Sequence, residues 1–482
     1  MIARALRGLG VLLLGLAVVL AVRASRFSTR QVTPDPPAPL AIDSAAAIER
    51  LALAIRIPTV SAEDPADGDS TQLVALHLLL DRSFGRVRDA LSREVINGNL
   101  LYTWRGSDSL LPALLMAGHM DVVPANSARW SHAPFSGTIA DGFLWGRGAL
   151  DDKIGVLGTL EAVEALLGDG FRPRRTIYLA FGGDEEVGGR HGAAVLAARL
   201  RERGVQLEAV IDEGGAIVEG VVPGVSAPVA TVGVAEKGSV SLALVAEVPG
   251  GHSSMPPAQT AIGLLSTAIV RLDANQFPAS LRASKGLFEA VGPEMTWSYR
   301  VLFANLWLFE PLLIRKLIRA PSTAAAVRTT IAPTIVQGGS KDNVLPGTAR
   351  AVVNLRILPG ETVSGTVERV RHVIDEPKVT VSLIGEGTDP SPVSPADAAP
   401  FRALAVAVRQ IHPDAVIAPY LVLGATDARY YASLTPNVYR FVPVHLTSSD
   451  LERLHGVDER VGLGDYVNAV RVYAQIIRGL AR

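Results

Sequence analysis

The sequence predicts an α/β fold with a mainly parallel sheet, into which a smaller α+β domain is inserted. From about residue 45, apolar strand-like runs alternate with segments of helical periodicity, which is typical of βαβ units. Between residues 237 and 388 the strand-like runs instead alternate polar and apolar residues, as half-exposed antiparallel strands do. A chain of 482 residues is also too long for one ordinary core.

The elements of the α/β layer can be placed in order along the chain. Buried strands are predicted at 110–118, 175–181 and 207–211, and helices at about 154–167 and 193–203. After the insertion, the pattern gives a helix at 401–410, a strand at 416–423 and a helix at 466–480. The layer is therefore formed by residues 45–236 and 389–482.

The insertion, residues 237–388, has its own elements. Alternating strands are predicted at 239–247 and 349–357, with helices at 260–272 and about 297–319. The run 301–318 is apolar on nearly every side, although Glu310 and Pro311 argue against a membrane-spanning helix. Two interpretations stay open: a buried helix of the insertion, or an apolar wall or membrane-facing patch that receives a long acyl chain.

The N-terminal residues 1–26 have the features of an export signal. Arg4 and Arg7 precede an apolar stretch at 8–22, and no good cleavage site follows it. The segment is therefore either a cleaved signal peptide or an uncleaved signal-anchor that contacts the membrane. Residues 27–44 are rich in proline and read as a linker. The positive flank places the rest of the chain across the membrane, in a periplasmic or extracellular location.

Composition limits the partners and the chemistry. The 46 basic and 47 acidic residues nearly balance, which argues against nucleic acid as a partner. The chain has no cysteine, so disulfides and cysteine-ligated zinc are excluded. A bound metal ion must be held by His, Asp and Glu side chains.

Such side chains follow four successive predicted elements, at the edge where a parallel sheet binds its ligands. They are His119 with Asp121, Asp151 at the start of a helix, Glu185 with Glu186, and Asp212 with Glu213. A set of imidazole and carboxylate groups suits two divalent ions, zinc above all, that share one carboxylate. In a pair of adjacent acids, one can bind an ion while the other takes a proton from water. The pattern predicts metal-assisted hydrolysis.

Five motifs resemble the M20 metallopeptidases, a family that includes aminoacylases and carboxypeptidases. They are His119-Met-Asp-Val-Val-Pro124, Gly146-Arg-Gly-Ala-Leu-Asp-Asp-Lys153, Asp184-Glu-Glu-Val-Gly188, Gly250-Gly-His-Ser-Ser254 and His455-Gly456. The leader and the segments 341–346 and 424–429 resemble the carboxypeptidase S branch and its relatives that act on N-fatty-acyl amino acids. The resemblance implies a di-zinc exopeptidase-type catalytic domain with a ferredoxin-like lid and dimerisation domain.

The resemblance also implies a role for each position. Asp151 would bridge two metal ions, and Glu185 would be the general base. Asp121 would orient the ring of His119. The remaining ligands would be His119, Glu186, Asp212 and His455, with Glu213 as the alternative to Asp212. A cis peptide is expected between Asp151 and Asp152.

Further residues are implied to bind substrate. His252 would reach the active site of a neighbouring subunit in a homodimer and stabilise the oxyanion of the tetrahedral intermediate. Asn343 would donate to the same oxygen or to the substrate. Arg356 and Arg429 are candidates for binding a substrate carboxylate, because a guanidinium binds it in a bidentate manner. Either arginine could equally form a structural ion pair.

The sequence therefore predicts an exported di-zinc amidohydrolase that acts on a substrate with a free α-carboxylate. The substrate would be a short peptide cleaved at its C-terminal bond or an N-acyl amino acid. The alternative within this class is a dedicated N-fatty-acyl amino acid hydrolase/synthase. The alternative from another class is a catalytically silent protein of the cell envelope that binds metal or peptide.

Overall fold

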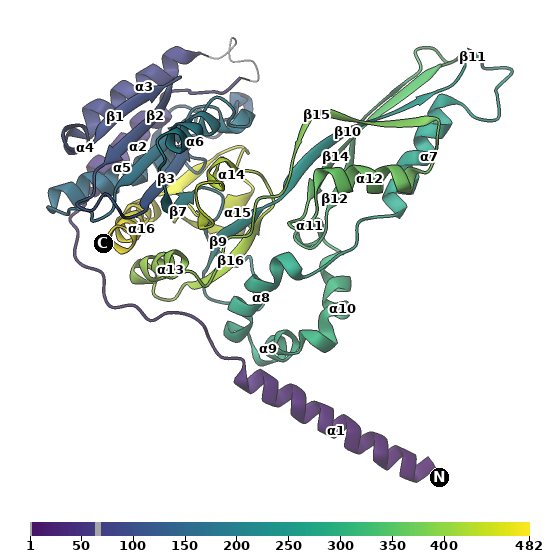
Figure 1. The fold of residues 1–482 in the computed structure, drawn as a ribbon, viewed down its shortest axis with the longest axis horizontal. Helices are drawn as coiled ribbons and strands as arrows, with labels where there is room; N and C mark the ends of the chain where they lie inside the picture. Colours follow the sequence, from purple (N-terminus) through teal and green to yellow (C-terminus); the bar gives the residue numbers. More distant parts are fainter. Residues whose placement is uncertain (1, 63–68) are drawn as a thin grey trace.

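The computed structural model describes residues 2–62 and 69–482, and a ten-stranded mixed sheet forms its centre (Figure 1). The strands follow the order β1-β2-β6-β3-β7-β17-β9-β8-β18, and β16 pairs with β9. Their bounds are β1 Ser92–Ile96, β2 Asn99–Trp104, β3 Ala113–His119, β6 Ile177–Gly182, β7 Leu207–Asp212, β8 Ile217–Glu219, β9 Val229–Glu236, β16 Val416–Val422, β17 Val438–Arg440 and β18 His445–Thr447.

Parallel pairing in the middle of this sheet places the site. β3 is parallel to both β6 and β7, and β17 is parallel to β7. These strands consist of almost continuous apolar residues, as strands buried on both faces do. Their carboxyl ends therefore meet at one edge of the sheet, as the sequence predicts.

Helices cover both faces of the sheet and bury two apolar layers. One layer includes residues of α2 (Ser44–Ile55), α3 (Ser70–Ser83), α4 (Gly85–Ala90), α5 (Lys153–Gly168), α13 (Ala399–Ile411) and α16 (Leu463–Leu480). The other packs α6 (Ala193–Glu202) and α14 (Ala428–Tyr431) against the sheet. Burial on both sides leaves the strand ends as the accessible edge for ligands.

A second, four-stranded antiparallel sheet extends away from the first (Figure 1). Its order is β12-β14-β10-β15, and with two helices the chain order is β-α-β-β-α-β, the ferredoxin-like arrangement. The bounds are β10 Gly238–Glu247, α7 Ala261–Ala274, β12 Thr330–Gly338, β14 Thr348–Ile357, α12 Val363–Ile374 and β15 Val379–Thr388. This sheet has a separate core, formed with α7 and α12. A short antiparallel pair of strands, β11 (Gly251–His252) and β13 (Val344–Leu345), lies at its tip.

Between α7 and β12 the chain forms a helical cluster, in which the helical stretch predicted at about 297–319 is divided into two helices. The cluster consists of α8 (Lys285–Val291), α9 (Trp297–Ala304), α10 (Leu306–Leu317) and α11 (Pro321–Ala325). Asn305 separates α9 from α10, and its side chain donates back to the oxygen of Val301. Local hydrogen bonding by an Asn side chain competes with helix continuation, which explains the break.

A small three-stranded sheet joins distant parts of the chain next to the ten-stranded sheet. β5 (Phe143–Trp145) pairs with β4 (Thr138–Ala140) on one side and with β19 (Arg460–Gly462) on the other. The loop that leads to Asp151 leaves β5, and the segment that contains His455 leads into β19. The pairing therefore brings the C-terminal histidine to the loop of Asp151.

The N-terminal helix α1 (Ile2–Arg26) projects away from the body (Figure 1). Met1 lies outside the described residues. α1 is long and apolar enough to cross a membrane, and Ala24 is its one buried residue. Residues 27–43 form no helix or strand, but they follow the body, where Gln31 exchanges two hydrogen bonds with the backbone of Ile417.

The buried ion pair of Arg440 and Glu236 generates a prediction about stability. Arg440 Nε donates to Glu236 Oε2 at 3.0 Å, and both side chains are buried between β17 and β9. Arg440→Met leaves the Glu236 carboxylate buried without its cation and should lower the free energy of unfolding by about 3–5 kcal/mol. Urea unfolding of this variant and of the exposed control Arg82→Met measures the effect. Equal stability of the two variants would contradict it.

Candidate metal centre

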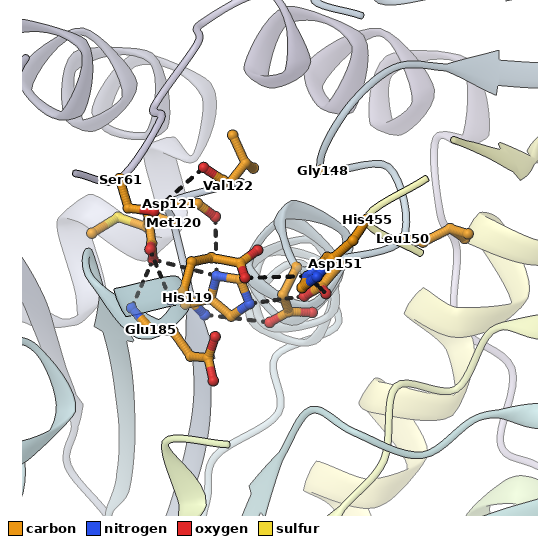
Figure 2. Close-up of polar contacts among 12 residues, drawn as sticks. Ser61, His119, Met120, Asp121, Val122, Gly148, Leu150, Asp151, Glu185 and His455 are labelled. Carbon is orange, nitrogen blue, oxygen red and sulfur yellow. Dashed lines mark hydrogen bonds and ion pairs between the residues drawn. The ribbon is translucent and has the colours of Figure 1, made fainter. Parts of the chain in front are cut away.

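Asp151 lies between two histidines, His119 and His455, that are distant in the sequence (Figure 2). Its Oδ1 is 2.9 Å from His119 Nε2, and its Oδ2 is 3.0 Å from His455 Nε2. His119 ends β3, whereas His455 lies in the turn before β19. One carboxylate thus presents each of its oxygens to a different imidazole.

Glu186 completes one side of this arrangement. It lies in a short 3-10 helix, η3 (Glu185–Val187), directly after β6, and its Oε2 is 3.1 Å from His455 Nε2. Ligand atoms of His119, Asp151 and Glu186 all lie within 4.8 Å of one another. Glu186 Oε1 is buried and has no hydrogen-bond partner within the described part of the chain.

Asp121 fixes both His119 and the acidic pair (Figure 2). His119 Nδ1 lies 3.0 Å from the backbone oxygen of Asp121, which can only accept, so Nδ1 carries the proton and Nε2 stays available as a ligand. The carboxylate of Asp121 lies 3.4 Å from the same ring nitrogen. It also accepts the backbone N–H groups of Glu185 and Glu186, both at 3.1 Å.

Asp212 and Glu213 both lie beside this centre. Asp212 ends β7, and its two carboxylate oxygens are buried with no partner among residues 2–62 and 69–482. Burial raises the pKa of Asp212 to about 6, and the charge of His119 is among those that oppose the rise. Glu213 lines an apolar pocket together with Asp151. Asp212 has the buried, unpartnered oxygens that a metal ligand needs, whereas Glu213 lines the pocket. This difference favours Asp212 over Glu213 as the ligand.

The electrostatics of the centre fit bound cations. Burial raises the pKa of Glu185, Asp152 and Glu213 well above the usual range, and neighbouring carboxylates raise it further. Hydrogen bonds to Asp151 and Glu186 raise the pKa of His455 to about 10. Crowded, buried carboxylates with unpartnered oxygens need positive charge, and divalent ions would supply it. Nitrogen and oxygen donors without sulfur suit zinc and related ions.

The expected cis peptide between Asp151 and Asp152 is present. Asp152 is buried, and its Oδ2 accepts the backbone N–H of His119 at 3.3 Å. This bond joins the end of β3 to the start of α5. A Cβ at Gly118 would lie 2.7 Å from the same oxygen, so the close approach requires glycine there.

Glu459, which was not predicted from the sequence, holds the loop of Asp151. Its Oε1 accepts the backbone N–H groups of Gly148, Leu150 and Asp151 at 3.0, 2.7 and 3.3 Å. Its Oε2 accepts from Arg147, and both side chains are buried. The available signal was an acid four residues after His455. The contacts of Glu459 join residues about three hundred positions apart in the sequence, and such contacts cannot be predicted from sequence periodicity.

Asp427 was also missed, although it lies in the segment 424–429 that carries part of the resemblance. Its carboxylate is buried, and neither oxygen has a partner in the described ranges. Burial and then the charge of Asp212 raise its pKa well above the usual range. Gly189, at φ +66°, packs so closely that a Cβ would lie 1.9 Å from Asp427 Oδ1. A further carboxylate thus lies behind the Glu185–Glu186 loop.

His252 of β11 and Asn343, which directly precedes β13, lie together at the tip of the second sheet, and β11 is far from β3, β6 and β7 (Figure 1). The N–H of Ser253 donates to the backbone oxygen of Asn343 at 3.1 Å. His252 is exposed, and its Nδ1 is 2.8 Å from Ser254 Oγ. The fold therefore does not bring these two residues to the metal centre of their own chain.

Of the two candidate arginines, Arg429 contacts the acidic loop. Its Nη2 donates to the oxygen of Gly188 at 2.7 Å, and its guanidinium lies over the ring of Tyr430. Arg356 lies on β14, opposite Ser239 of β10 and Thr330 of β12. It forms no ion pair in the part of the chain that the structure describes.

Comparisons with known proteins agree with this geometry. Residues 115–479 match the model of peptidase family M20/M25/M40. The chain is 40% identical to the probable carboxypeptidase S-like 2 of Dictyostelium discoideum, over 97% of this chain and 92% of that protein. It is 41% identical to the N-fatty-acyl-amino acid synthase/hydrolase PM20D1 of Xenopus tropicalis, over 89% of this chain and 85% of that protein.

Among solved structures, the M20 family metallo-carboxypeptidase Sso-CP2 from Sulfolobus solfataricus superposes with a TM-score of 0.67. The match covers 90% of this chain and 99% of that chain at 17% identity, so it shows a shared fold.

The role of Glu459 can be tested by Glu459→Gln. The variant keeps the shape of the side chain but loses the charge that holds Arg147 and three backbone N–H groups. We expect metal affinity to fall by about 10–100-fold, as when a residue that orients a ligand is lost. Zinc titration against a competing chelator measures this, with the exposed Glu452→Gln as the control. The same affinity in both variants would contradict the role.

Proposed function

Because the chain belongs to peptidase family M20/M25/M40 and is a metal-dependent hydrolase, we propose that it is a di-zinc amidohydrolase for substrates with a free α-carboxylate. The bond cleaved is the C-terminal peptide bond of a short peptide or the amide bond of an N-acyl amino acid. The arrangement of Asp151 between His119 and His455, with Glu185 next to Glu186, supports this proposal above all.

Two divalent ions, preferably zinc, would share Asp151. His119 and Asp212 would complete one ligand set, and His455 and Glu186 the other. Bound there, the ions would polarise the substrate carbonyl and activate water. The unpartnered oxygens of Glu186 and Asp212 support these assignments.

Glu185 would be the general base in this reaction. It would take a proton from the attacking water and deliver it to the leaving amine, as one positioned carboxylate can do in sequence. Burial raises the pKa of Glu185, which strengthens its carboxylate as a base. Asp121 would keep this carboxylate in place through the N–H groups of residues 185 and 186.

Arg429 and Arg356 would recognise the substrate carboxylate, and Asn343, which lies beside His252 at the tip, would reach the carbonyl oxygen or the substrate in the site of a second subunit. Arg429 is the stronger candidate, because its guanidinium lies next to the loop of the proposed base. His252 would stabilise the oxyanion from a second subunit. Its exposed position at a tip remote from its own centre supports a homodimer formed through the second sheet, in which residues 237–388 would act as lid and dimerisation domain.

The alternative of a dedicated N-fatty-acyl amino acid hydrolase/synthase is favoured by one further feature. An apolar pocket of about 320 Å³ begins at Asp151 and Glu213. Its walls include Val218, Val221, Leu287, Val444, Leu446 and Leu454. An acyl chain in this pocket would place its carbonyl beside the metal ligands. Relatives named N-fatty-acyl-amino acid synthase/hydrolase agree with this substrate class.

The proposal also includes location. α1 would direct the chain out of the cytoplasm and either be removed or remain as a membrane anchor. A catalytically silent envelope protein remains the rival from another class, but each expected ligand and the proposed base are present in the sequence.

Glu185→Gln tests the mechanism. The variant cannot take the proton from water, so turnover should fall by about 10²–10⁴-fold while the metal ligands stay intact. Release of free amino acid from dipeptides, N-acetyl amino acids and N-oleoyl amino acids measures activity, and metal content is determined in parallel. Normal turnover by the variant would contradict the mechanism. Failure of the metal-loaded wild-type protein on the whole panel would favour the silent protein.

Val221→Trp tests the acyl pocket. Val221 lines the pocket and is 37% exposed, so an indole there narrows the mouth without overpacking the core. We expect kcat/KM for the N-oleoyl substrate to fall by about 10-fold or more while the N-acetyl substrate is hardly affected. Val95→Trp, on an edge strand outside the pocket, serves as the control. An equal loss for both chain lengths would rule out the pocket as the acyl site.

A further inference from the structure

The end of α1 is bound to the junction of α9 and α10. Asn305 Nδ2 donates to the oxygen of Leu20 at 3.1 Å, and Arg23 Nε donates to the oxygen of Ala304 at 3.2 Å. Phe27 packs so closely that a Cβ on Gly292 would lie 2.6 Å from its ring. Asn305 is fully buried in this contact. The last turns of α1 therefore have a fixed position on the body (Figure 1).

No part of the chain that the structure describes covers the rest of α1. Its side chains from Ile2 to Val22 are exposed or at most half-buried, and none of the window suited to a membrane span is buried. The apolar stretch 8–22 is about 22 Å long at the rise of an α-helix. A helix of this composition requires an apolar environment, and a bilayer provides it. Residues 20–26 would then lie at the membrane surface, where the helix leaves the bilayer.

Apolar side chains on and next to α9 and α10 are exposed beside the end of α1. The set, which we call the α9–α10 patch, consists of Trp297, Trp307, Leu308, Leu312 and Ile318, between 37% and 59% exposed. The opposite side of the two helices packs on the core through Phe303 and Leu313. The interpretation of residues 301–318 as a buried helix was therefore wrong for the outer face.

The charges around the α9–α10 patch match a lipid surface. Residues 297–319 contain four basic side chains, Arg300, Arg315, Lys316 and Arg319, and one acidic side chain, Glu310. Tryptophans at the water boundary, aliphatic side chains and basic residues are the composition of helices that lie in a membrane interface. Basic residues near such a surface are attracted to anionic lipids.

The segment after α1 also restricts the orientation of the body. Besides the exchange between Gln31 and Ile417, Arg30 pairs with Glu289 at 3.1 Å, and the side chain of Gln410 donates to the backbone oxygen of Asp35. The body therefore cannot swing freely about α1. An anchored chain would hold the α9–α10 patch at the membrane surface.

We propose that the α9–α10 patch lies in the interfacial layer of a lipid bilayer and forms a second membrane contact beside α1. A retained membrane-spanning helix already fixes attachment, so the second contact would fix the orientation of the body on the membrane surface. A second copy of the chain is a less suitable occupant, because the patch is continuous with a helix that itself requires lipid. The proposal requires α1 to be retained, and it does not depend on the reaction catalysed.

The absence of cysteine allows a direct test with the full chain. Leu312→Cys, at a position 59% exposed, is labelled with the fluorophore NBD and reconstituted into vesicles of phosphatidylcholine and phosphatidylglycerol. We expect the emission to shift to shorter wavelength, with about half of it quenched by lipids that carry a nitroxide near the glycerol. Leu110→Cys, 93% exposed in the loop before β3, is the matched control and should be quenched by aqueous iodide alone.

Three results would overturn the proposal. The label at 312 could respond as the control does, which would place it in water. It could be protected from iodide without quenching by nitroxide lipids, which would indicate a protein partner such as a second copy. The full chain could also fail to associate with the vesicles. A second label at Trp307→Cys, 59% exposed, must agree with the first.

Discussion

The contact of one carboxylate, that of Asp151, with two imidazoles is the constraint on which the rest of the structure depends. His119 ends β3, and His455 lies in the turn before β19. The chain must therefore bring its C-terminal segment back to the loop after β5. Glu459 joins these parts by binding the backbone of residues 148–151. The small sheet of β19, β5 and β4 is therefore as important to the site as the large sheet, although it contributes little to the core.

The same centre creates an electrostatic cost that the fold must offset. Several carboxylates from distant parts of the chain are buried near one another, and burial together with their mutual repulsion raises their pKa values. Protein cations offset the charge at a distance: Arg147 pairs with Glu459, and Arg440 with Glu236. Glu236 also accepts from the backbone and hydroxyl of Thr426, next to Asp427. Among residues 2–62 and 69–482, buried oxygens of Glu186, Asp212 and Asp427 have no hydrogen-bond partner, and bound cations would offset their charge.

Most of the layer that carries the site could be predicted from the sequence, because parallel strands end at one edge and the acids follow those strands. His119, Asp151 and Glu186 meet there as expected. Asp427 and Glu459 could not be found in this way, since their contacts depend on tertiary packing between distant segments. The apolar run 301–318 was ambiguous for a related reason: composition does not tell which face of a helix is covered. The structure resolves it by burying Phe303 and Leu313 and exposing Trp307 and Leu312.

The most direct test of the central claim is a crystal structure of the zinc-loaded protein with anomalous diffraction at the zinc edge. The account predicts two ions, one on each side of the Asp151 carboxylate, with His119 bound to one and His455 to the other. A single ion, or ions that bind without Asp151, would contradict it.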